Sequence, residues 1–138
     1  FKPRNPQKYK GNPNNIIYRS TWEIRVMRYL DDNPNVIWWA SEELPIPYYS
    51  PVDKKKHRYF PDFIAQMRRA DGSLMTYVIE VKPEKQTKPP TQKRKTKAFL
   101  HEAITYEVNK AKWAAAKKFA EVNKIQFVVL TENELFDK

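Results

Sequence analysis

The chain has 138 residues, 41% of them hydrophobic, which is enough for one folded domain with a core and too few for two. Its 26 Lys and Arg residues, against 16 Asp and Glu, give a net charge of +10, which favours a polyanion as partner. The absence of Cys excludes disulfides, thiolate catalysis and zinc–thiolate sites, and it is compatible with a reducing compartment.

Nothing in the sequence predicts a membrane partner, since no apolar run approaches the roughly 20 residues that a bilayer requires. The opening stretch is polar, basic and proline-containing, so it does not resemble a signal peptide. Because there is no initiator Met, we expect a few further residues to precede Phe1.

The N-terminal part predicts an arm followed by a helix. Residues 1–17 are rich in Pro, Asn and Lys, and we expect an extended basic arm there, ahead of a single domain at residues 18–138. Ser20-Thr21-Trp22-Glu23 has the pattern of a capping box, so a helix should run from about residue 21 to residue 30. Asp31-Asp32-Asn33-Pro34 should end it.

The next part of the chain predicts strands separated by a basic turn. Val36-Ile37-Trp38-Trp39 indicates a strand. Residues 44–49 indicate an extended edge segment, because two prolines keep this stretch out of a sheet interior. Residues 54–58, all basic, should form a turn. Residues 59–67 and 74–82 then predict two further strands.

The last two of these strands should form a hairpin. Ala70-Asp71-Gly72 fits a three-residue loop with Gly in the left-handed position. Residues equally far from Asp71 then face each other, so Asp62, nine positions before it, lies opposite Glu80, nine positions after it. Lys82 shares their face because strand side chains alternate. Apolar residues occupy the other face, namely Phe63, Ala65, Met67, Tyr77, Ile79 and Val81.

A basic loop, a long helix and a strand complete the chain. Residues 82–97 contain seven Lys or Arg and three prolines, which predicts a loop. A helix should run from about residue 96 to residue 121, and residues 126–131 should form a buried strand. The helix carries an apolar stripe at helical spacing, formed by Leu100, Ile104, Val108, Ala111, Ala115, Phe119 and Val122. This order of elements predicts a mixed α/β domain with a central mixed sheet flanked by helices.

Asp62 and Glu80 indicate a metal site, because two close carboxylates repel and a divalent cation relieves that repulsion. Mg²⁺ takes one or two carboxylates, several waters and phosphate oxygens, and Mn²⁺ is an alternative ion. The Val81 carbonyl would be a further ligand. Lys82 would orient or deprotonate a water, or neutralise developing charge. This pattern is typical of a metal-dependent nuclease, and the basic chain indicates DNA as its substrate.

Glu23 has two interpretations, which the sequence leaves open. It completes the capping box with Ser20, or it contributes from the helix to a second metal or to a bound water. Both roles are compatible. Glu23 is therefore a candidate catalytic residue and a candidate metal ligand.

Cations around the predicted site are candidate contacts to the DNA backbone, although such stretches are more often solvated surface. Arg19 precedes the first helix, while Asn109 and Lys112 lie on the long helix off its apolar stripe. The predicted DNA-binding residues are Arg19, Arg58, Lys85, Lys88, Lys93, Arg94, Lys95 and Lys112.

Three spaced motifs together resemble the PD-(D/E)xK nuclease superfamily. They are Tyr18-Arg19-Ser20-Thr21-Trp22-Glu23, Arg58-Tyr59-Phe60-Pro61-Asp62-Phe63 and Val78-Ile79-Glu80-Val81-Lys82-Pro83. Within the superfamily the chain is similar to the head completion nucleases of T4-like tailed phages. It is more distantly similar to the endonuclease subunit of heteromeric transposases. The resemblance extends from about Tyr9 to Thr131.

The resemblance implies a restriction-endonuclease-like core and Mg²⁺-dependent phosphodiester hydrolysis. Asp62 and Glu80 would be the metal ligands, Lys82 the catalytic lysine and Glu23 the helix acid. Asn109 stands where the family pattern leads us to expect Gln. The resemblance also implies action on packaged DNA or its ends during head completion, in the host cytoplasm or associated with the virion. Head or packaging proteins, and a second copy in a homodimer, are the implied partners besides DNA.

Two alternatives to an active nuclease remain. One is a catalytically silent module that binds DNA or fills a structural place in the phage head. The other is an endonuclease subunit of a transposition complex that is active only beside its partner. Cleavage of DNA by the isolated protein would argue against both alternatives and for an enzyme that acts alone.

Overall fold

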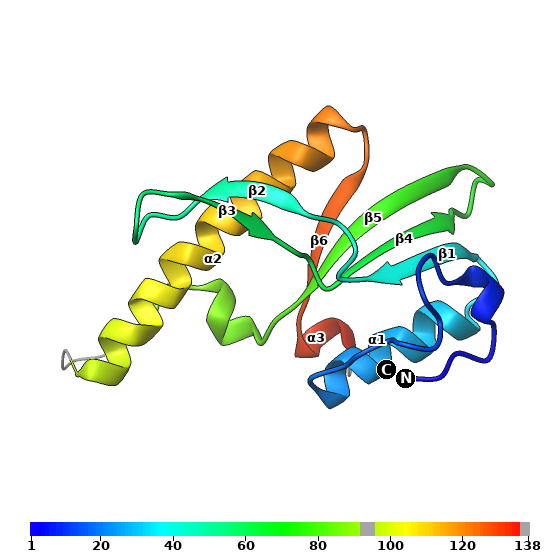
Figure 1. The fold of residues 1–138 in the computed structure, drawn as a ribbon, viewed down its shortest axis with the longest axis horizontal. Helices are drawn as coiled ribbons and strands as arrows, with labels where there is room; N and C mark the ends of the chain where they lie inside the picture. Colours follow the sequence, from blue (N-terminus) through cyan, green and yellow to red (C-terminus); the bar gives the residue numbers. More distant parts are fainter. Residues whose placement is uncertain (92–95, 136–138) are drawn as a thin grey trace.

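The computed structural model describes residues 1–91 and 96–135, and its centre is a four-stranded sheet (Figure 1). The strands lie in the order β1-β4-β5-β6, with the three neighbours β1, β4 and β5 antiparallel and β6 parallel to β5. Their bounds are β1 (Val36–Ser41), β4 (Phe63–Arg68), β5 (Leu74–Val81) and β6 (Gln126–Leu130). A mixed sheet flanked by helices confirms the predicted fold class, a restriction-endonuclease-like core.

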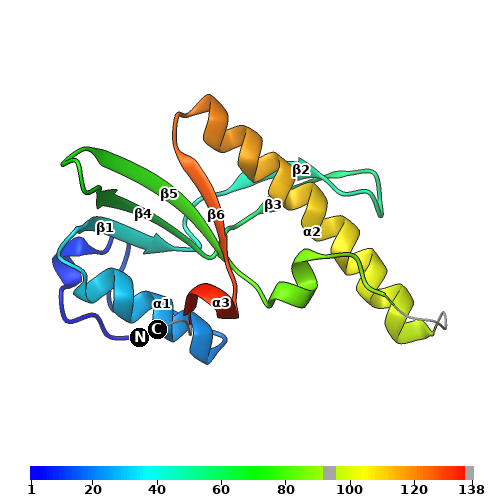
Figure 2. The same ribbon diagram turned by 180° about the vertical axis from the view of Figure 1, so that it is seen from behind.

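Two layers cover the two faces of this sheet (Figures 1 and 2). On one face lie α1 (Thr21–Asp32) and the short α3 (Glu132–Leu135), which the sequence analysis missed. On the other face lie α2 (Lys97–Val122) and a separate two-stranded hairpin of β2 (Ile46–Tyr49) and β3 (Lys56–Tyr59). Two 3₁₀ turns, Pro6–Lys8 and Glu84–Thr87, complete the structure.

The sheet divides the hydrophobic core into two clusters, one on each face. The α1 side contains the larger cluster, in which Trp39 and Phe63 are almost completely buried. The α2 side contains a smaller cluster in which Val78 of β5 packs with Ala116 of α2. Both clusters therefore fix β4 and β5, the two strands at which the predicted carboxylates lie.

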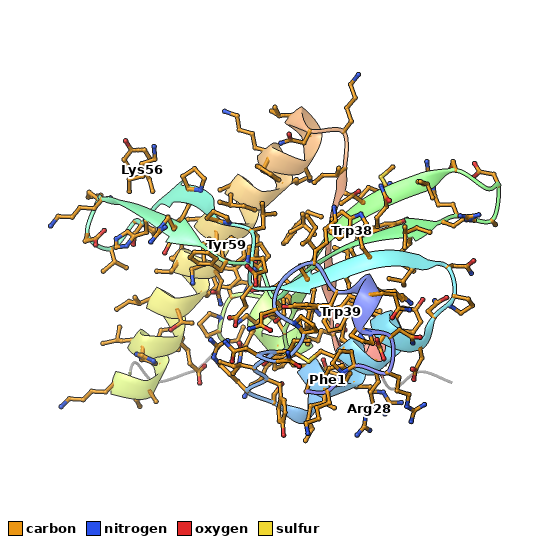
Figure 3. The ribbon with its side chains drawn as sticks, turned by 45° about the vertical axis from the view of Figure 1, so that its right-hand side comes forward. Phe1, Arg28, Trp38, Trp39, Lys56 and Tyr59 are labelled. Atoms are coloured by element: carbon orange, nitrogen blue, oxygen red, sulfur yellow. The ribbon has the colours of Figure 1, made fainter. Side chains whose placement is uncertain are left out.

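The N-terminal segment, expected as an extended arm, lies against α1 and β1. Tyr9 is buried, its hydroxyl accepts a hydrogen bond from the Ser41 N–H at 3.2 Å, and its ring contacts Trp39 at 4.8 Å between centroids. Phe1 packs edge-on against the same Trp39 ring, as Figure 3 illustrates. The buried Asp31 carboxylate accepts the backbone N–H groups of residues 4 and 5 at 2.8 and 3.1 Å. This segment is consequently part of the packed domain.

The β4–β5 hairpin has the register that the sequence predicted. Phe63 pairs with Ile79, and Arg68 pairs with Leu74, so each pair is symmetric about Asp71. Gly72 has φ +86°, the left-handed conformation expected for the loop glycine. The apolar face predicted for this hairpin packs on the α1 side of the sheet.

Two predicted elements need correction. The strand predicted at residues 59–67 is two strands, because Tyr59 ends β3 and Phe63 begins β4. Most of the basic turn predicted at residues 54–58 is β3 itself. The residues of β3 do not show the apolar alternation of a half-buried strand, since β3 is exposed except at Tyr59. The β2–β3 hairpin lies outside the main sheet, and its exposed strand does not need one apolar face.

The predicted apolar stripe of α2 is correct only in part, since Ala115 and Phe119 pack against the smaller core cluster. Leu100, Ile104 and Val122 are about half or more exposed, while the buried residues of the helix are Asn109, Ala116 and Ala120. The buried face is turned by about one residue from the predicted one. Asn109 is buried on this face, and Trp113 packs against the smaller core cluster.

Among residues 1–91 and 96–135, none of the helices combines the length and the apolarity needed to span a bilayer.

Candidate active site

Asp62 and Glu80 are brought together at the ends of the two central strands. Asp62 immediately precedes β4, and Glu80 is the penultimate residue of β5. The observed register, continued by one residue beyond the Phe63–Ile79 pair, places the two carboxylates opposite each other. Glu80 is only 4% exposed. The structure therefore brings together the pair that the sequence predicted.

The surroundings of Asp62 favour its protonated form. One carboxylate oxygen of Asp62 accepts the Val81 N–H at 2.7 Å. Burial, and next the negative charge of Glu80, raise the pKa of Asp62 to about 7, although the Val81 N–H and the Lys82 charge act in the opposite direction. Two buried carboxylates in contact are thus held at an electrostatic cost that a bound cation would remove.

Two aromatic residues that sequence reasoning did not assign to the site contact Glu80. The Trp113 indole N–H of α2 donates to the Glu80 carboxylate at 3.4 Å, a long hydrogen bond. Tyr59 lies at the inner end of β3, where burial, and then the Glu80 charge, raise its pKa. The Tyr59 hydroxyl makes no well-formed hydrogen bond within the described part of the chain, although it lies near Glu80. The sequence indicated a core position for Trp113 and gave Tyr59 only as the start of a strand and as part of the second motif.

Lys82 lies directly beyond β5, on the face that Glu80 occupies. Its backbone N–H donates to the Leu130 carbonyl of β6 at 3.0 Å, which fixes the backbone of this segment. Its charge lowers the pKa of Asp62, so the ammonium group acts on the carboxylate pair. The N–H and carbonyl of a strand residue point to the same side, and the Val81 carbonyl therefore points toward Asp62, as its N–H does.

Glu23 lies in the first turn of α1, where it takes part in the N-terminal cap formed by Ser20, the first of the two roles left open by the sequence. Its N–H donates to the Ser20 hydroxyl at 3.2 Å, which caps the helix, and the same hydroxyl donates to the Glu23 carboxylate at 3.2 Å. Burial, and then the negative charge of Asp62, raise the pKa of Glu23. The helix acid is therefore near enough to the carboxylate pair to interact with it electrostatically.

The predicted DNA-binding cations occupy different surroundings. Arg19 forms an ion pair with Glu42, whose backbone N–H donates to the Asp62 carbonyl at 3.1 Å. Lys112 lies over the Tyr59 ring at 5.7 Å. Lys93, Arg94 and Lys95 fall outside the residues that the structure describes.

A cavity of about 550 Å³ lies between the segment 85–91 and the first half of α2. Lys85 and Lys88 line one wall, and Asn109, which is 95% buried, lines the other. Asn109 lies one helical turn before Trp113, the residue whose indole contacts Glu80. Two predicted DNA contacts thus border this cavity.

The residues present fit a Mg²⁺ ion. No group of three or more His, Asp or Glu side chains within the described ranges encloses a metal position, so a cage made only by the protein is not formed there. Mg²⁺ commonly uses one or two carboxylates and keeps several waters, which suits the Asp62 and Glu80 pair. Zn²⁺ prefers nitrogen and sulfur ligands, which this pair lacks.

Comparisons with known proteins agree with this geometry. The family described as TnsA-like endonuclease N terminal matches residues 33–132, a span that includes the whole sheet and both carboxylates. The chain belongs to this family. It is also 41% identical to the head completion nuclease of Enterobacteria phage T4, in an alignment that covers 96% of this chain and 89% of that protein. No solved structure matches the chain. Membership of the TnsA-like endonuclease family, together with this relative, supports nuclease activity and therefore a hydrolase.

Proposed function

We propose that the chain is a Mg²⁺-dependent endodeoxyribonuclease that hydrolyses phosphodiester bonds. The observation that carries this proposal is the pair of facing carboxylates, Asp62 and Glu80, with Lys82 beside them. Two buried acids lie close together and the pKa of one is raised to about 7, so a bound cation would relieve their repulsion when both are ionised. The net charge of +10 favours DNA as the polyanion.

Each residue of the site has a defined part in this proposal. Asp62, Glu80 and the Val81 carbonyl would hold the ion, with Glu23 as a further acid from α1. When bound, Mg²⁺ supplies Lewis-acid polarisation of the scissile phosphate and a more acidic water. Lys82 orients the attacking water and offsets the negative charge that develops on the phosphate.

The surrounding residues hold these groups in place. The Val81 N–H fixes the orientation of Asp62 at 2.7 Å, and the Trp113 indole restricts Glu80 from the α2 side. Both donors act on the carboxylates rather than on the substrate, so they position the site and exclude water. Lys85, Lys88 and Lys112 would attract the DNA backbone toward it.

A biological role in phage head completion follows from the relative in phage T4. We propose that the enzyme acts on packaged DNA or its ends in the infected cell, either free in the cytoplasm or associated with the virion. A T4 phage without its head completion nuclease tests this role. The wild-type chain should restore infectious particles and Glu80→Gln should not, whereas rescue by both proteins would indicate a structural role.

Cleavage assays test the chemistry directly. Linear, circular, single-stranded and branched DNA would be incubated with the wild type in Mg²⁺, Mn²⁺ or EDTA. Asp62→Asn, Glu80→Gln and Lys82→Met should each lower the rate by at least about 100-fold, a loss typical of groups that stabilise the transition state. Glu121→Gln changes an exposed acid near the end of α2 and should leave the rate unchanged.

The results separate the alternatives. Cleavage in EDTA, or full activity of both Asp62→Asn and Glu80→Gln, would contradict the proposal. Tight, salt-sensitive binding of DNA without cleavage in either metal would favour a silent binding module. Cleavage that appears only when a partner protein is added would favour the transposition-type subunit.

A further inference from the structure

The β2–β3 hairpin is a basic projection for which the site described above gives no role. Its turn and third strand carry Lys54, Lys55, Lys56 and Arg58 in succession, interrupted only by His57, and all five side chains are exposed. In Figures 1 and 2 the turn of this hairpin extends away from the main sheet. The domain thus presents a concentrated positive charge at the end of a thin two-stranded ribbon.

Little negative charge offsets this cluster. Asp53 is the acid of the hairpin, and its carboxylate is 2.6 Å from the His57 ring nitrogen. No ion pair within the described residues joins Lys54, Lys55 or Lys56 to a carboxylate. Arg58 lies over the Phe60 ring at 5.6 Å, which orients the guanidinium without neutralising it. The charges remain available to an external anion.

The two faces of the ribbon differ. Ile46 and Tyr59, which pair across the strands, are buried on the α2 side. Tyr49 and Lys56 form another cross-strand pair, and Tyr49 is 70% exposed. Val52 in the turn is 59% exposed. The ribbon therefore combines cations with two exposed apolar side chains at its outer end.

The hairpin is directly connected to the carboxylate pair. Tyr59 ends β3 beside Glu80, and only Phe60 and Pro61 separate it from Asp62. In Figure 3, Lys56 lies toward the outer part of the hairpin, while Tyr59 lies toward the middle of the molecule. A polyanion held along the ribbon would accordingly lead to the site.

We propose that the β2–β3 hairpin binds double-stranded DNA through its backbone phosphates and so makes a duplex the substrate of the neighbouring site. A two-stranded antiparallel ribbon fits the major groove of B-form DNA, and a flexible single strand offers no such groove. Lys54, Lys55 and Lys56 contact phosphates, and Tyr49 and Val52 contact sugars and base edges. This inference rests on the proposed nuclease function and specifies its substrate.

The test measures the salt dependence of binding to a labelled duplex of about 20 base pairs and to one of its strands. Wild type is compared with Lys54→Gln/Lys55→Gln/Lys56→Gln, with EDTA present and the integrity of the DNA checked on a gel. Each lost phosphate contact should reduce the slope of log K against log salt by about one, so the triple variant should lose about three. Lys117→Gln/Lys118→Gln/Lys124→Gln is the matched control, with three exposed lysines, one of them at positive φ as Lys54 is.

A second variant tests the apolar contacts independently. Tyr49→Ala/Val52→Ala should weaken duplex binding several-fold with an unchanged salt slope, since no charge is removed. Wild type should bind the duplex more tightly than the single strand, and the triple hairpin variant should lose most of that preference. Circular dichroism of each variant checks the fold, and all substituted residues are exposed.

The outcomes distinguish this inference from the nuclease proposal. Equal slope changes in the hairpin and control variants, or a wild-type preference for the single strand, would overturn the inference. If wild type nevertheless cleaves DNA in Mg²⁺, the nuclease proposal survives that result. If the hairpin slope falls as expected and no DNA is cleaved, the hairpin is a duplex-binding element, and both the catalytic proposal and the assignment of a cleaved substrate fail.

Discussion

The two central carboxylates have different neighbours, and the difference determines how each one is held. Asp62 is fixed by a backbone donor, the Val81 N–H at 2.7 Å, so its position depends on the strand itself. Glu80 is fixed by a side chain from another element, the Trp113 indole at 3.4 Å. A substitution at Trp113 can therefore change the environment of Glu80 without altering the sheet, so the effect of this contact can be measured separately.

Trp113→Phe should slow cleavage by about fivefold with the fold retained. Loss of the indole N–H removes a hydrogen bond to a charged acceptor, and we expect a cost of about 1 kcal/mol because the bond is long. Rates under saturating DNA measure the effect. Trp38→Phe is the control. The Trp38 ring, on β1, lies under the Lys10 ammonium group, and a Phe ring can make the same cation–π contact. An equal loss in both variants would attribute the effect to packing.

Asp62 should also make the stability of the metal-free protein depend on pH. Its pKa is raised from 3.8 to about 7 in the folded chain, so the folded state binds the proton more tightly than the unfolded state does. Its stabilising contribution is fully present below about pH 4 and is lost as the pH rises through about 7. Asp62→Asn should remove this decline while retaining an acceptor for the Val81 N–H.

Thermal unfolding in EDTA at pH 5 to 8 measures this effect. The difference between wild type and Asp62→Asn isolates the contribution of one carboxyl group from the rest of the chain. The variant should gain stability relative to wild type as the pH rises. A difference that is constant with pH, or one that changes in the opposite direction, would contradict the raised pKa.

The sequence predicted the carboxylate pair because its placement depends only on local geometry. Asp62 and Glu80 are symmetric about a short loop whose glycine takes a left-handed conformation, and strand alternation then assigns the face. The contacts of Tyr59 and Trp113 with Glu80 depend instead on how distant elements dock. A Trp at a helical position predicts burial, and nothing in its spacing indicates which carboxylate its N–H meets.

At the level of whole elements, α2 shows the same limit. Helical periodicity correctly predicted the helix and its ends within about one residue. The predicted stripe is wrong toward the ends of the helix, because only part of the helix crosses the sheet and the hairpin, which leaves Leu100 and Val122 exposed. A search for apolar periodicity cannot predict the burial of Asn109, because its side chain is polar. Its place beside the cavity explains why a polar residue occupies the buried face.

Asp31 determines how the N-terminal segment is attached to α1, so Asp31→Ala should destabilise the fold by about 3 kcal/mol. Its buried carboxylate accepts two backbone N–H groups, from Arg4 and Asn5, and both donors would lose their partner. Urea unfolding measures the change. Asp32→Ala is the control, because its pairing with Arg4 at 3.8 Å is exposed and should contribute less than about 0.5 kcal/mol. Equal effects would contradict a specific attachment.

In the whole molecule, the carboxylates lie where both cores meet the basic surface. Phe63 and Val78 pack into different core clusters on opposite faces of the same hairpin, so the strands that position the site are held from both faces. The cations are instead distributed over exposed turns and helices, on α2 and on the β2–β3 hairpin. Because the acids are buried and the cations are exposed, we expect salt to affect DNA binding much more than the chemical step.

Salt should therefore raise KM steeply and leave kcat almost unchanged. With a net charge of +10, contacts to six phosphates would weaken binding by about a thousandfold between 50 and 200 mM salt. The buried carboxylate pair is screened much less by salt than exposed charges are, so the chemical step should vary by less than about twofold. Steady-state cleavage of one duplex at several NaCl concentrations and fixed Mg²⁺ separates the two constants. A parallel fall in kcat would mean that salt reaches the site itself, which would contradict the burial of Glu80 at 4% exposure.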